Sequence, residues 1–348
     1  MATKTIKKKA VAKPNAVKRT ATLYAVQYGT TPNSLHLKET TEITVGPKET
    51  LAPDISAMVS YSIGPDAYLF TYSNKSHHYA IYKVEAGGAA LTKTGDGELH
   101  YGKAKPLAYT IITPFILGGV QYIVAYEPKG GKFDYYALDG KSANGVADYS
   151  YYVGLNPQSR GFTEIDTFNV RYTQYMFAYD THLGTMIIFQ LSVPPIGPKI
   201  YTTPYLIANP SWAPGWVRFA CFQWGGENFF LKTNIKEHDV NIDHIFDEPL
   251  DGTHPVGDDL PLSQTLTTVN PFFHDFAPYF LTFDEKDGAI TFNRFHSDAK
   301  GWTEQASNLN KIGKHTKFIT PIQLTVPLAK NQQMRKGVTN YTTYILVY

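Results

Sequence analysis

The chain has 348 residues, of which 43% are hydrophobic, 14% aromatic and 18% charged, so a globally disordered chain is excluded. No run of about 18 apolar residues occurs, and no membrane-spanning helix is predicted. The single cysteine, Cys221, excludes an internal disulfide framework. High tyrosine and phenylalanine content together with 27 Gly and 22 Pro favours many short strands and turns over long helices.

The chain begins with a basic segment, residues 1–21, which carries six lysines and Arg19 but no acidic residue. The formal net charge is +2, so the remaining body, residues 22–348, is mildly acidic and is predicted to form one folded domain. The segment lacks the apolar stretch of a secretory signal, which indicates a cytoplasmic protein or release by a non-classical route. It either contacts an anionic partner, such as nucleic acid or a membrane surface, or is a solvated, disordered tail.

Two strands are predicted next, at residues 22–28 and 34–38, and after them a short pattern recurs six times. Each occurrence of the short pattern, here called an anchor, has an aromatic residue, two apolar residues and a second aromatic or polar residue. The longer unit that contains one anchor is called a copy of the repeat. The spacings between the first residues are 54, 53, 54, 50 and 65. A period of this length is the signature of a repeat architecture. The anchors begin at Tyr68, Tyr122, Tyr175, Phe229, Tyr279 and Tyr344.

The sequence before the anchors repeats as well. Seven residues ahead of each of the first five anchors stands an aromatic residue, whereas the sixth copy has Ile322, displaced by an insertion containing residues 330–337. These residues, here called flank aromatics, are Tyr61, Phe115, Phe168, Phe222 and Phe272. The constant spacing indicates that every copy has the same local structure.

Each copy is predicted to contain three or four antiparallel strands. In the second copy a strand at 109–115 leads through Gly118 and Gly119 to the anchor strand, followed by strands at 133–138 and 147–153. Such units repeated radially predict an all-β fold, a six-bladed β-propeller. The last copy ends after its second strand, so the two N-terminal strands are expected to complete it and close the ring. Seven blades are the alternative, if residues 22–48 form a blade of their own.

No motif identifies a reaction. The chain has no P-loop, dinucleotide fingerprint, zinc-protease or nucleophile-elbow sequence. Cys221 is expected to be a buried packing thiol, and the histidines and the acidic segments 251–259 and 284–288 do not match metal-binding spacings. Neither a metal nor a cofactor is expected.

The candidate ligand-binding residues lie in the predicted loops. The second-to-third-strand turns and the connections between blades share one rim of a propeller, where aromatic plates beside hydrogen-bonding groups suit a sugar. Alternatively, the tryptophans pack between blades. The candidates are Trp212, Trp216, Trp302, Glu127, Asp180, His182, Asn234 and Asp284.

The repeat also resembles those of bacterial and fungal β-propeller lectins and related toxin-associated propellers. The resemblance is carried by Gly215-Trp216, Phe222, Gly225-Gly226 and Phe229, and by Pro114-Phe115, Gly118-Gly119, Tyr122, Tyr126 and Gly131. It implies a lectin-like protein that binds a glycan or glycoprotein. Unlike those lectins, this chain has no tryptophan that recurs from blade to blade. An enzyme with its site at the mouth of the central tunnel and a protein-interaction platform are the alternatives.

Overall fold

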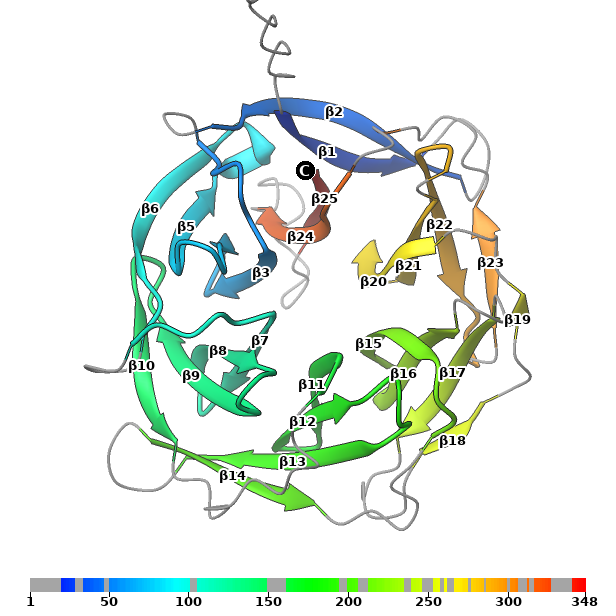
Figure 1. Ribbon diagram of the computed structural model, residues 1–348. Coiled ribbons are helices and arrows are strands. Elements are labelled where there is room, and N and C mark those ends of the chain that lie inside the picture. Colours follow the sequence, from blue (N-terminus) through cyan, green and yellow to red (C-terminus); the bar gives the residue numbers. More distant parts are fainter. Residues whose placement is uncertain are drawn as a thin grey trace, which may run out of the picture.

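Each copy of the repeat forms one antiparallel sheet of a six-bladed β-propeller, as predicted (Figure 1). The computed structural model describes residues 20–28, 34–46, 50–100, 105–148, 161–193, 199–205, 212–234, 239–245, 253–256, 260–261, 266–274, 277–284, 286–298, 301–305, 312, 316–326 and 340–348. The basic segment therefore lies outside the described residues up to position 19. Among the described residues, no helix is long and apolar enough to span a membrane.

Within blades 1 to 5 the strands run outward from the central channel in chain order (Figure 1). Blade 1 comprises β3 (Ala57–Ile63), β4 (Asp66–Tyr72), β5 (His78–Val84) and β6 (Leu91–Glu98), with the 3-10 turn η1 (Ala86–Gly88) before β6. Blade 2 comprises β7 (Ile111–Leu117), β8 (Val120–Glu127), β9 (Lys132–Leu138) and β10 (Ala143–Asp148), and blade 3 β11 (Glu164–Val170), β12 (Thr173–Tyr179), β13 (Met186–Ser192) and β14 (Lys199–Tyr205). Blade 4 comprises β15 (Trp216–Trp224), β16 (Glu227–Asn234), β17 (Asp239–Ile245), β18 (Thr253–Pro255) and β19 (Leu260–Pro261), and blade 5 β20 (Leu266–His274), β21 (Ala277–Asp284), β22 (Ala289–Phe295) and β23 (Trp302–Gln305).

The sixth blade closes the ring with both ends of the chain. Its strands follow the order β24 (Ile319–Val326), β25 (Asn340–Val347), β1 (Thr20–Tyr28) and β2 (Leu35–Thr44), so the two inner strands come from the C-terminal end of the chain and the two outer strands from the N-terminal end. β1 pairs antiparallel with β25, from Thr22 opposite Val347 to Ala25 opposite Tyr344. The red and blue strands lie side by side in Figure 1. The predicted closure is thus confirmed, and residues 20–44 do not form a seventh blade.

The seven-residue spacing has a simple structural cause. The first two strands of blades 1 to 5 form a hairpin, and the flank aromatic lies directly opposite the first residue of the anchor. In all five blades the two rings stack, with centroids 5.3–5.6 Å apart. Stacked cross-strand rings stabilise a sheet beyond their buried area. The pairs are Tyr61–Tyr68, Phe115–Tyr122, Phe168–Tyr175, Phe222–Phe229 and Phe272–Tyr279.

Tight turns with positive φ close the hairpins of blades 2 and 4. Gly118 and Gly119 have φ values of 59° and 78°, and Gly225 and Gly226 have 63° and 87°. These are left-handed conformations that glycine adopts without the steric penalty of a Cβ. The Gly-Gly pairs of the sequence therefore fix the hairpin length, and with it the register that stacks the rings.

Side chains on the innermost strands hold neighbouring blades together. Thr167 Oγ1 donates to the backbone oxygen of Pro114 at 2.9 Å, Ser60 Oγ to that of Pro321 at 2.7 Å, and Asn270 Nδ2 to that of Ile319 at 2.6 Å. Such bonds satisfy backbone groups that face a neighbouring blade across the channel wall. Together with the apolar clusters shared by neighbouring blades, they make the inner wall continuous.

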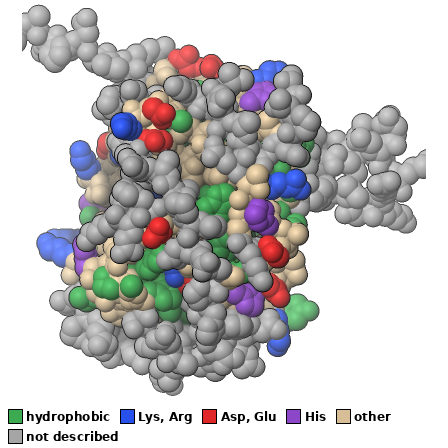
Figure 2. Space-filling view, turned by 90° about the vertical axis from the view of Figure 1, so that its right-hand side faces the viewer, with side chains coloured by type: hydrophobic (Ala, Val, Ile, Leu, Met, Phe, Trp, Pro, Cys, Tyr) green, Lys and Arg blue, Asp and Glu red, His purple; other side chains and the backbone are tan. Residues whose placement is uncertain are grey.

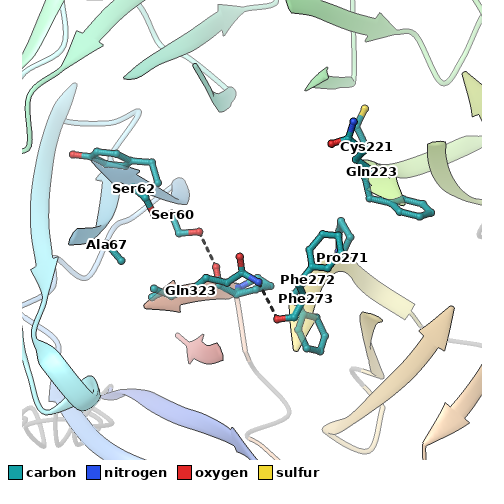
Figure 3. Close-up of a pocket in the computed structure, with 13 residues that line it drawn as sticks. Ser60, Ser62, Ala67, Cys221, Gln223, Pro271, Phe272, Phe273 and Gln323 are labelled. Atoms are coloured by element: carbon teal, nitrogen blue, oxygen red, sulfur yellow. Dashed lines mark hydrogen bonds between the residues drawn. The ribbon is translucent and has the colours of Figure 1, made fainter. Parts of the chain in front are cut away.

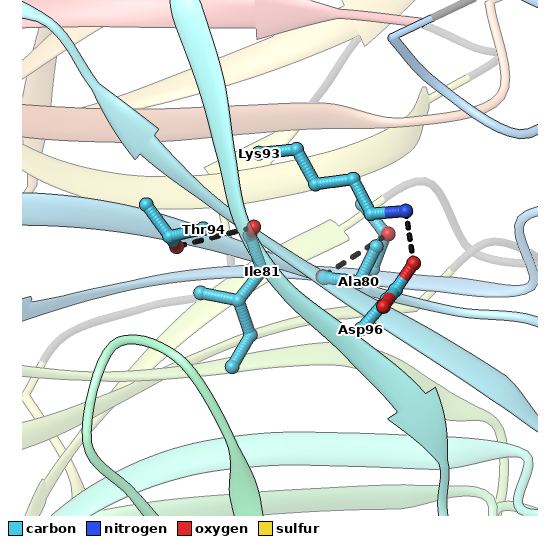
Figure 4. Close-up of polar contacts among 6 residues, drawn as sticks. Ala80, Ile81, Lys93, Thr94 and Asp96 are labelled. Atoms are coloured by element: carbon cyan, nitrogen blue, oxygen red, sulfur yellow. Dashed lines mark hydrogen bonds and ion pairs between the residues drawn. The ribbon is translucent and has the colours of Figure 1, made fainter.

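The outer strands are less regular. The fourth strand of blade 2, predicted at 147–153, is β10 at Ala143–Asp148, and residues 149–153 lie outside the described part. It pairs in parallel with β14 of blade 3. In blade 1, β6 follows β5 past a bulge at Ile81, where Thr94 Oγ1 donates to the Ile81 oxygen at 3.3 Å and Lys93 pairs with Asp96 (Figure 4).

The described side chains do not gather one sign of charge on the face shown in Figure 2, where acidic and basic groups are interspersed. Apolar side chains instead form clusters between and within the blades, built largely from Tyr and Phe. The aromatic richness of the sequence therefore belongs mainly to the core.

Candidate functional site

The propeller has two rims of different composition. The upper rim is the side that carries the turns between second and third strands, such as residues 180–185, and the connections between blades, such as residues 212–215. We call lower rim the opposite side, with the hairpin turns between first and second strands, such as 118–119 and 225–226. The backbone of Gly215 donates to the Thr181 oxygen at 2.8 Å, and that of Trp212 to the Gly184 oxygen at 3.0 Å. Turns and connections thus share the upper rim, as the sequence suggested.

Several of the candidate residues meet where blades 3 and 4 adjoin. The turn from Asp180 to Gly184 docks on the connection from Trp212 to Trp216, and Thr181 Oγ1 donates to the Trp216 oxygen at 3.0 Å. Asn234 ends the strand opposite Trp216. Asp180, His182, Trp212, Trp216 and Asn234 are therefore neighbours, whereas Glu127 lies in blade 2 and Asp284 in blade 5.

The tryptophans of this group are engaged in packing. Trp216 is buried, and Trp212 is half-buried and stacks on Phe219 with centroids 5.3 Å apart and planes 7° from parallel. Lys232 Nζ lies 4.1 Å from the centroid of Trp212 and 4.7 Å from that of Trp216, and pairs with Asp243 at 2.6 Å. Cation–π contacts and this buried ion pair fix both indoles against blade 4.

The acidic candidates serve their own turns. Glu127 accepts the backbone N–H of Lys129 at 2.8 Å and of Gly130 at 2.7 Å, and Asp180 that of His182 at 2.8 Å. Asp284 accepts the N–H of Lys286 at 2.8 Å. Carboxylates at these positions stabilise turns by bonding to the backbone two or three residues on. Asp180 and Asn234 are also buried, whereas His182 is exposed.

Trp302 does not join the other candidates. It begins β23 and pairs with Phe295 immediately after the turn between the third and fourth strands of blade 5. That turn lies at the lower rim, since successive antiparallel strands end at opposite rims. The half-buried Trp302 ring meets Phe280 edge-on at 5.1 Å. The expectation that Trp302 shares a rim with the other residues is therefore corrected.

A cavity of about 410 Å³ lies in the central channel toward the lower rim (Figure 3). Four blades line it, and those with Ser60 and Cys221 face each other across the open space. The volume lies within the range of ligand pockets. None of the eight residues predicted from the sequence lines it. The lining residues are Ser60, Tyr61, Ser62, Ala67, Cys221, Phe222, Gln223, Pro271, Phe272, Phe273, Pro321, Ile322 and Gln323.

The repeat itself places the cavity residues. They are largely triplets centred on the flank aromatics of blades 1, 4 and 5 and on Ile322 of blade 6. Side chains alternate along a strand, so the buried central residue turns into the blade and its two neighbours turn toward the channel. The same triplets in blades 2 and 3 are Pro114-Phe115-Ile116 and Thr167-Phe168-Asn169. Flank positions, rather than loop tryptophans, were the sequence signal for this site.

The polar groups of the cavity are neutral. Ser62 and Gln223 are exposed to it, and Gln323 donates one amide hydrogen to the Phe273 oxygen at 2.9 Å. Amides and hydroxyls both donate and accept, so each retains capacity for a further partner. The exposed ring of Phe273 lies next to Gln323, whereas the buried Phe272 stacks on Tyr279 within blade 5 (Figure 3). This arrangement can hold a small, uncharged ligand that has both hydroxyl groups and an apolar face.

The titratable groups of the lining are Tyr61 and Cys221, and burial raises the pKa of both, so both are neutral at pH 7. Cys221 is half-buried rather than fully buried, and its backbone N–H donates to Asp166 Oδ2 of blade 3 at 2.6 Å. Burial also raises the pKa of Asp166, to about 6, although bonds from the Cys221 and Thr167 backbones oppose the shift.

A bulge in β15 shapes this part of the wall. The register shifts between Val217 and Ala220, and Arg218 has a φ of 56°. Burial raises the pKa of Glu164, while the Arg218 charge and the backbone N–H groups of Arg218 and Phe219 act against that shift. The bulge thus turns successive backbone donors of blade 4 toward the two carboxylates of β11.

Among the described residues, no group of three or more His, Cys, Asp or Glu side chains is arranged to hold a metal ion. His77 lies in a turn with a φ of 58°, and His78 begins β5. His238 lies outside the described residues.

The comparisons with known proteins return propellers at low similarity. No family model matches the chain, and no curated protein is similar to it in sequence. Among solved structures, a GH43_1 enzyme from Xanthomonas citri has a TM-score of 0.46 at 11% identity, covering 74% of this chain and 93% of that one. The periplasmic gluconolactonase of Pseudomonas aeruginosa has a TM-score of 0.46 at 10% identity, covering 85% and 97%.

An exo-β-1,3-galactanase from Clostridium thermocellum has a TM-score of 0.43 at 10% identity, and the match covers 67% of this chain but only 57% of the galactanase. At such values these likenesses carry no conclusion about ligand or activity. The chain is a six-bladed β-propeller, and the comparisons do not show the lectin family that its repeat resembles.

Proposed function

We propose that this protein is a carbohydrate-binding propeller and that its ligand occupies the central cavity at the lower rim. The observation that carries the proposal is the composition of the cavity wall, in which Ser60, Ser62, Gln223 and Gln323 share the cavity with the exposed ring of Phe273. Sugars present hydroxyl groups for directional hydrogen bonds and a C–H face for an aromatic ring. The resemblance of the repeat to lectin-like propellers supports the same function.

The wall favours binding over catalysis. An enzyme at the tunnel mouth would need an acid and a base within reach of the substrate. In the part of the chain that the structure describes, no carboxylate, imidazole, amine or guanidinium lines the cavity, and the two titratable groups, Tyr61 and Cys221, have raised pKa values. The upper-rim tryptophans are less suited to a sugar because they pack against Phe219 and Lys232.

A glycan array followed by calorimetry on the full chain tests the proposal. We expect a signal for at least one sugar, and a 5- to 30-fold loss of affinity in Gln223→Ala and in Gln323→Ala, equivalent to about 1–2 kcal/mol for each lost hydrogen bond. Gln27→Ala, at an exposed position of β1, is the matched control and should bind as the parent does.

Two results would count against the proposal. Absence of any sugar signal from folded protein would remove carbohydrate binding. Loss of binding in the upper-rim variant His182→Ala, with binding retained in Gln223→Ala, would instead place the ligand among the residues that the sequence first suggested.

A further inference from the structure

The central cavity has a carboxylate directly behind its wall. Asp166 of β11 accepts the backbone N–H of Cys221 at 2.6 Å, and Cys221 is itself a cavity-lining residue. The other oxygen of Asp166 accepts the Thr167 N–H at 2.8 Å. Both of these bonds come from the backbone, and the Cys221 thiol bonds to the carboxylate as well, so Asp166 has its hydrogen-bond partners but no opposite charge bonded to it in these contacts. Its negative charge is therefore felt in the cavity with little local compensation.

Resting on the function proposed above, we propose that the cavity selects an uncharged terminal sugar and rejects acidic sugars, and that Asp166 is the residue responsible for this rejection. Among the described residues that line the wall, none is a cation that would attract a carboxylate, sulfate or phosphate group. An anionic ligand in the cavity would lose part of its hydration, gain no ion pair and meet the field of Asp166.

The other charged groups around Asp166 do not reverse this effect. Glu164 lies two residues away on the same face of β11, and any charge on its carboxyl group has the same sign as that of Asp166. Arg218 on β15 interacts with Glu164 and is exposed, so solvent screens it. Cys221, also on β15, stays a neutral thiol because burial raises its pKa.

The expected discrimination follows from Coulomb's law. Two like charges about 7 Å apart, at the effective dielectric of about 20–40 found near protein surfaces, repel each other enough to weaken binding roughly tenfold or more. Neutral sugars carry no charge and are not repelled by Asp166 in this way. The selectivity should therefore depend on the ionisation of Asp166 and not on the shape of the cavity alone.

The experiment compares matched ligands by calorimetry at pH 7.5. The probes are neutral hexose-terminated oligosaccharides from the array and the same cores capped with glucuronic acid or sialic acid. We expect the acid-capped forms to bind at least about tenfold more weakly. Asp166→Asn should recover most of that difference while changing affinity for the neutral form less than about twofold.

Glu98→Gln is the matched control, because it removes an exposed carboxylate from the outer strand of blade 1. It should leave both affinities as they are. If Asp166→Asn does not fold, the parent protein at pH 5 makes the same test, since Asp166 has a pKa of about 6 and is then mostly protonated while the acidic sugars remain charged.

The outcomes separate the two proposals. Equal or tighter binding of acid-capped sugars, or a preference that survives both Asp166→Asn and pH 5, overturns the role of Asp166 and leaves carbohydrate binding intact. If neither neutral nor acidic sugars bind, the proposed function fails and this inference fails with it.

Discussion

At the scale of single residues, the fold raises the pKa of Asp166, the carboxylate that lies directly behind the cavity wall. Its pKa rises from an ordinary 3.8 to about 6 because the channel wall surrounds it. The folded protein therefore holds this proton more tightly than the unfolded chain does. The resulting stabilisation is fully present below about pH 4 and is lost as the pH rises through about 6. Glu164, whose pKa is also raised, acts in the same direction.

We therefore expect the free energy of unfolding of the parent protein to fall, relative to Asp166→Asn, between pH 4 and pH 7. The difference should be up to about 3 kcal/mol, since each unit of pKa shift is worth about 1.4 kcal/mol. Urea denaturation at several pH values measures it. Asparagine removes the charge and keeps one oxygen for the Cys221 N–H, although its amide nitrogen cannot accept the Thr167 N–H, which adds a pH-independent offset. Parallel pH profiles for the two proteins would contradict the assigned shift.

Single residues also show where the sequence was insufficient. The cavity residues Ser60, Cys221, Pro271 and Pro321 occupy one register, but serine and cysteine stand in two blades and proline in the other two, so no hydrogen-bonding side chain recurs there. A search for recurring residues therefore passes over them. Trp302 was predicted on the wrong rim for another reason. The turn between the third and fourth strands lies at the lower rim and the connection to the next blade at the upper rim, and Gly301 is compatible with either position.

At the scale of the element, the repeated hairpin with its stacked rings is the unit that folds in each blade. Phe168 shows how this unit also joins blades, because it stacks on Tyr175 at 5.4 Å and meets Phe230 of blade 4 edge-on at 5.3 Å. Its side chain is buried. The stacked pair thus contributes both to the hairpin register and to the contact with the next blade.

Replacing Phe168 with alanine should lower the free energy of unfolding by about 3–5 kcal/mol, the usual cost of removing a buried phenylalanine. Phe168→Leu should cost less, because it retains part of the volume. Asn169→Ala, at the exposed neighbouring position, serves as the control and should change stability by less than about 0.5 kcal/mol. Comparable losses in Phe168→Ala and Asn169→Ala would show that the stacked pair carries no special stability.

The hairpins were predictable because their cause is local. Flank aromatic, Gly-Gly turn and anchor lie within a few residues of one another, so Phe115, Gly118 and Tyr122 specify one hairpin without reference to the rest of the chain. The outer strands were less predictable, as β10 shows, because their positions depend on contacts with the next blade. There β10 pairs with β14, which is more than 50 residues away.

At the scale of the whole molecule, blade 6 decides whether the ring is closed. β1 supplies a neighbour for β25, and without it the backbone edge of β25 would be exposed. The closure can be predicted only when the N-terminal and C-terminal segments are considered together, because neither segment carries a complete copy of the repeat. The incomplete last copy and the two unassigned N-terminal strands made the closure predictable.

Deletion of residues 1–44, which removes β1 and β2, should abolish the cooperative unfolding transition or yield aggregated protein. Deletion of residues 1–19 removes no part of β1 and should change the melting temperature by no more than about 2 °C. Scanning calorimetry and size-exclusion chromatography distinguish the two. A folded monomer from the longer deletion would show that the ring does not need its N-terminal strands.

The pairing of β1 with β25 also determines how the molecule responds to tension. The strands are antiparallel, and Thr22, near the start of one, lies opposite Val347, near the end of the other. A pull applied to the two termini therefore acts at one edge of the ladder and separates its hydrogen bonds one after another, as in a zipper, instead of loading them together. The seam that completes the propeller is thus the place where force would first open it.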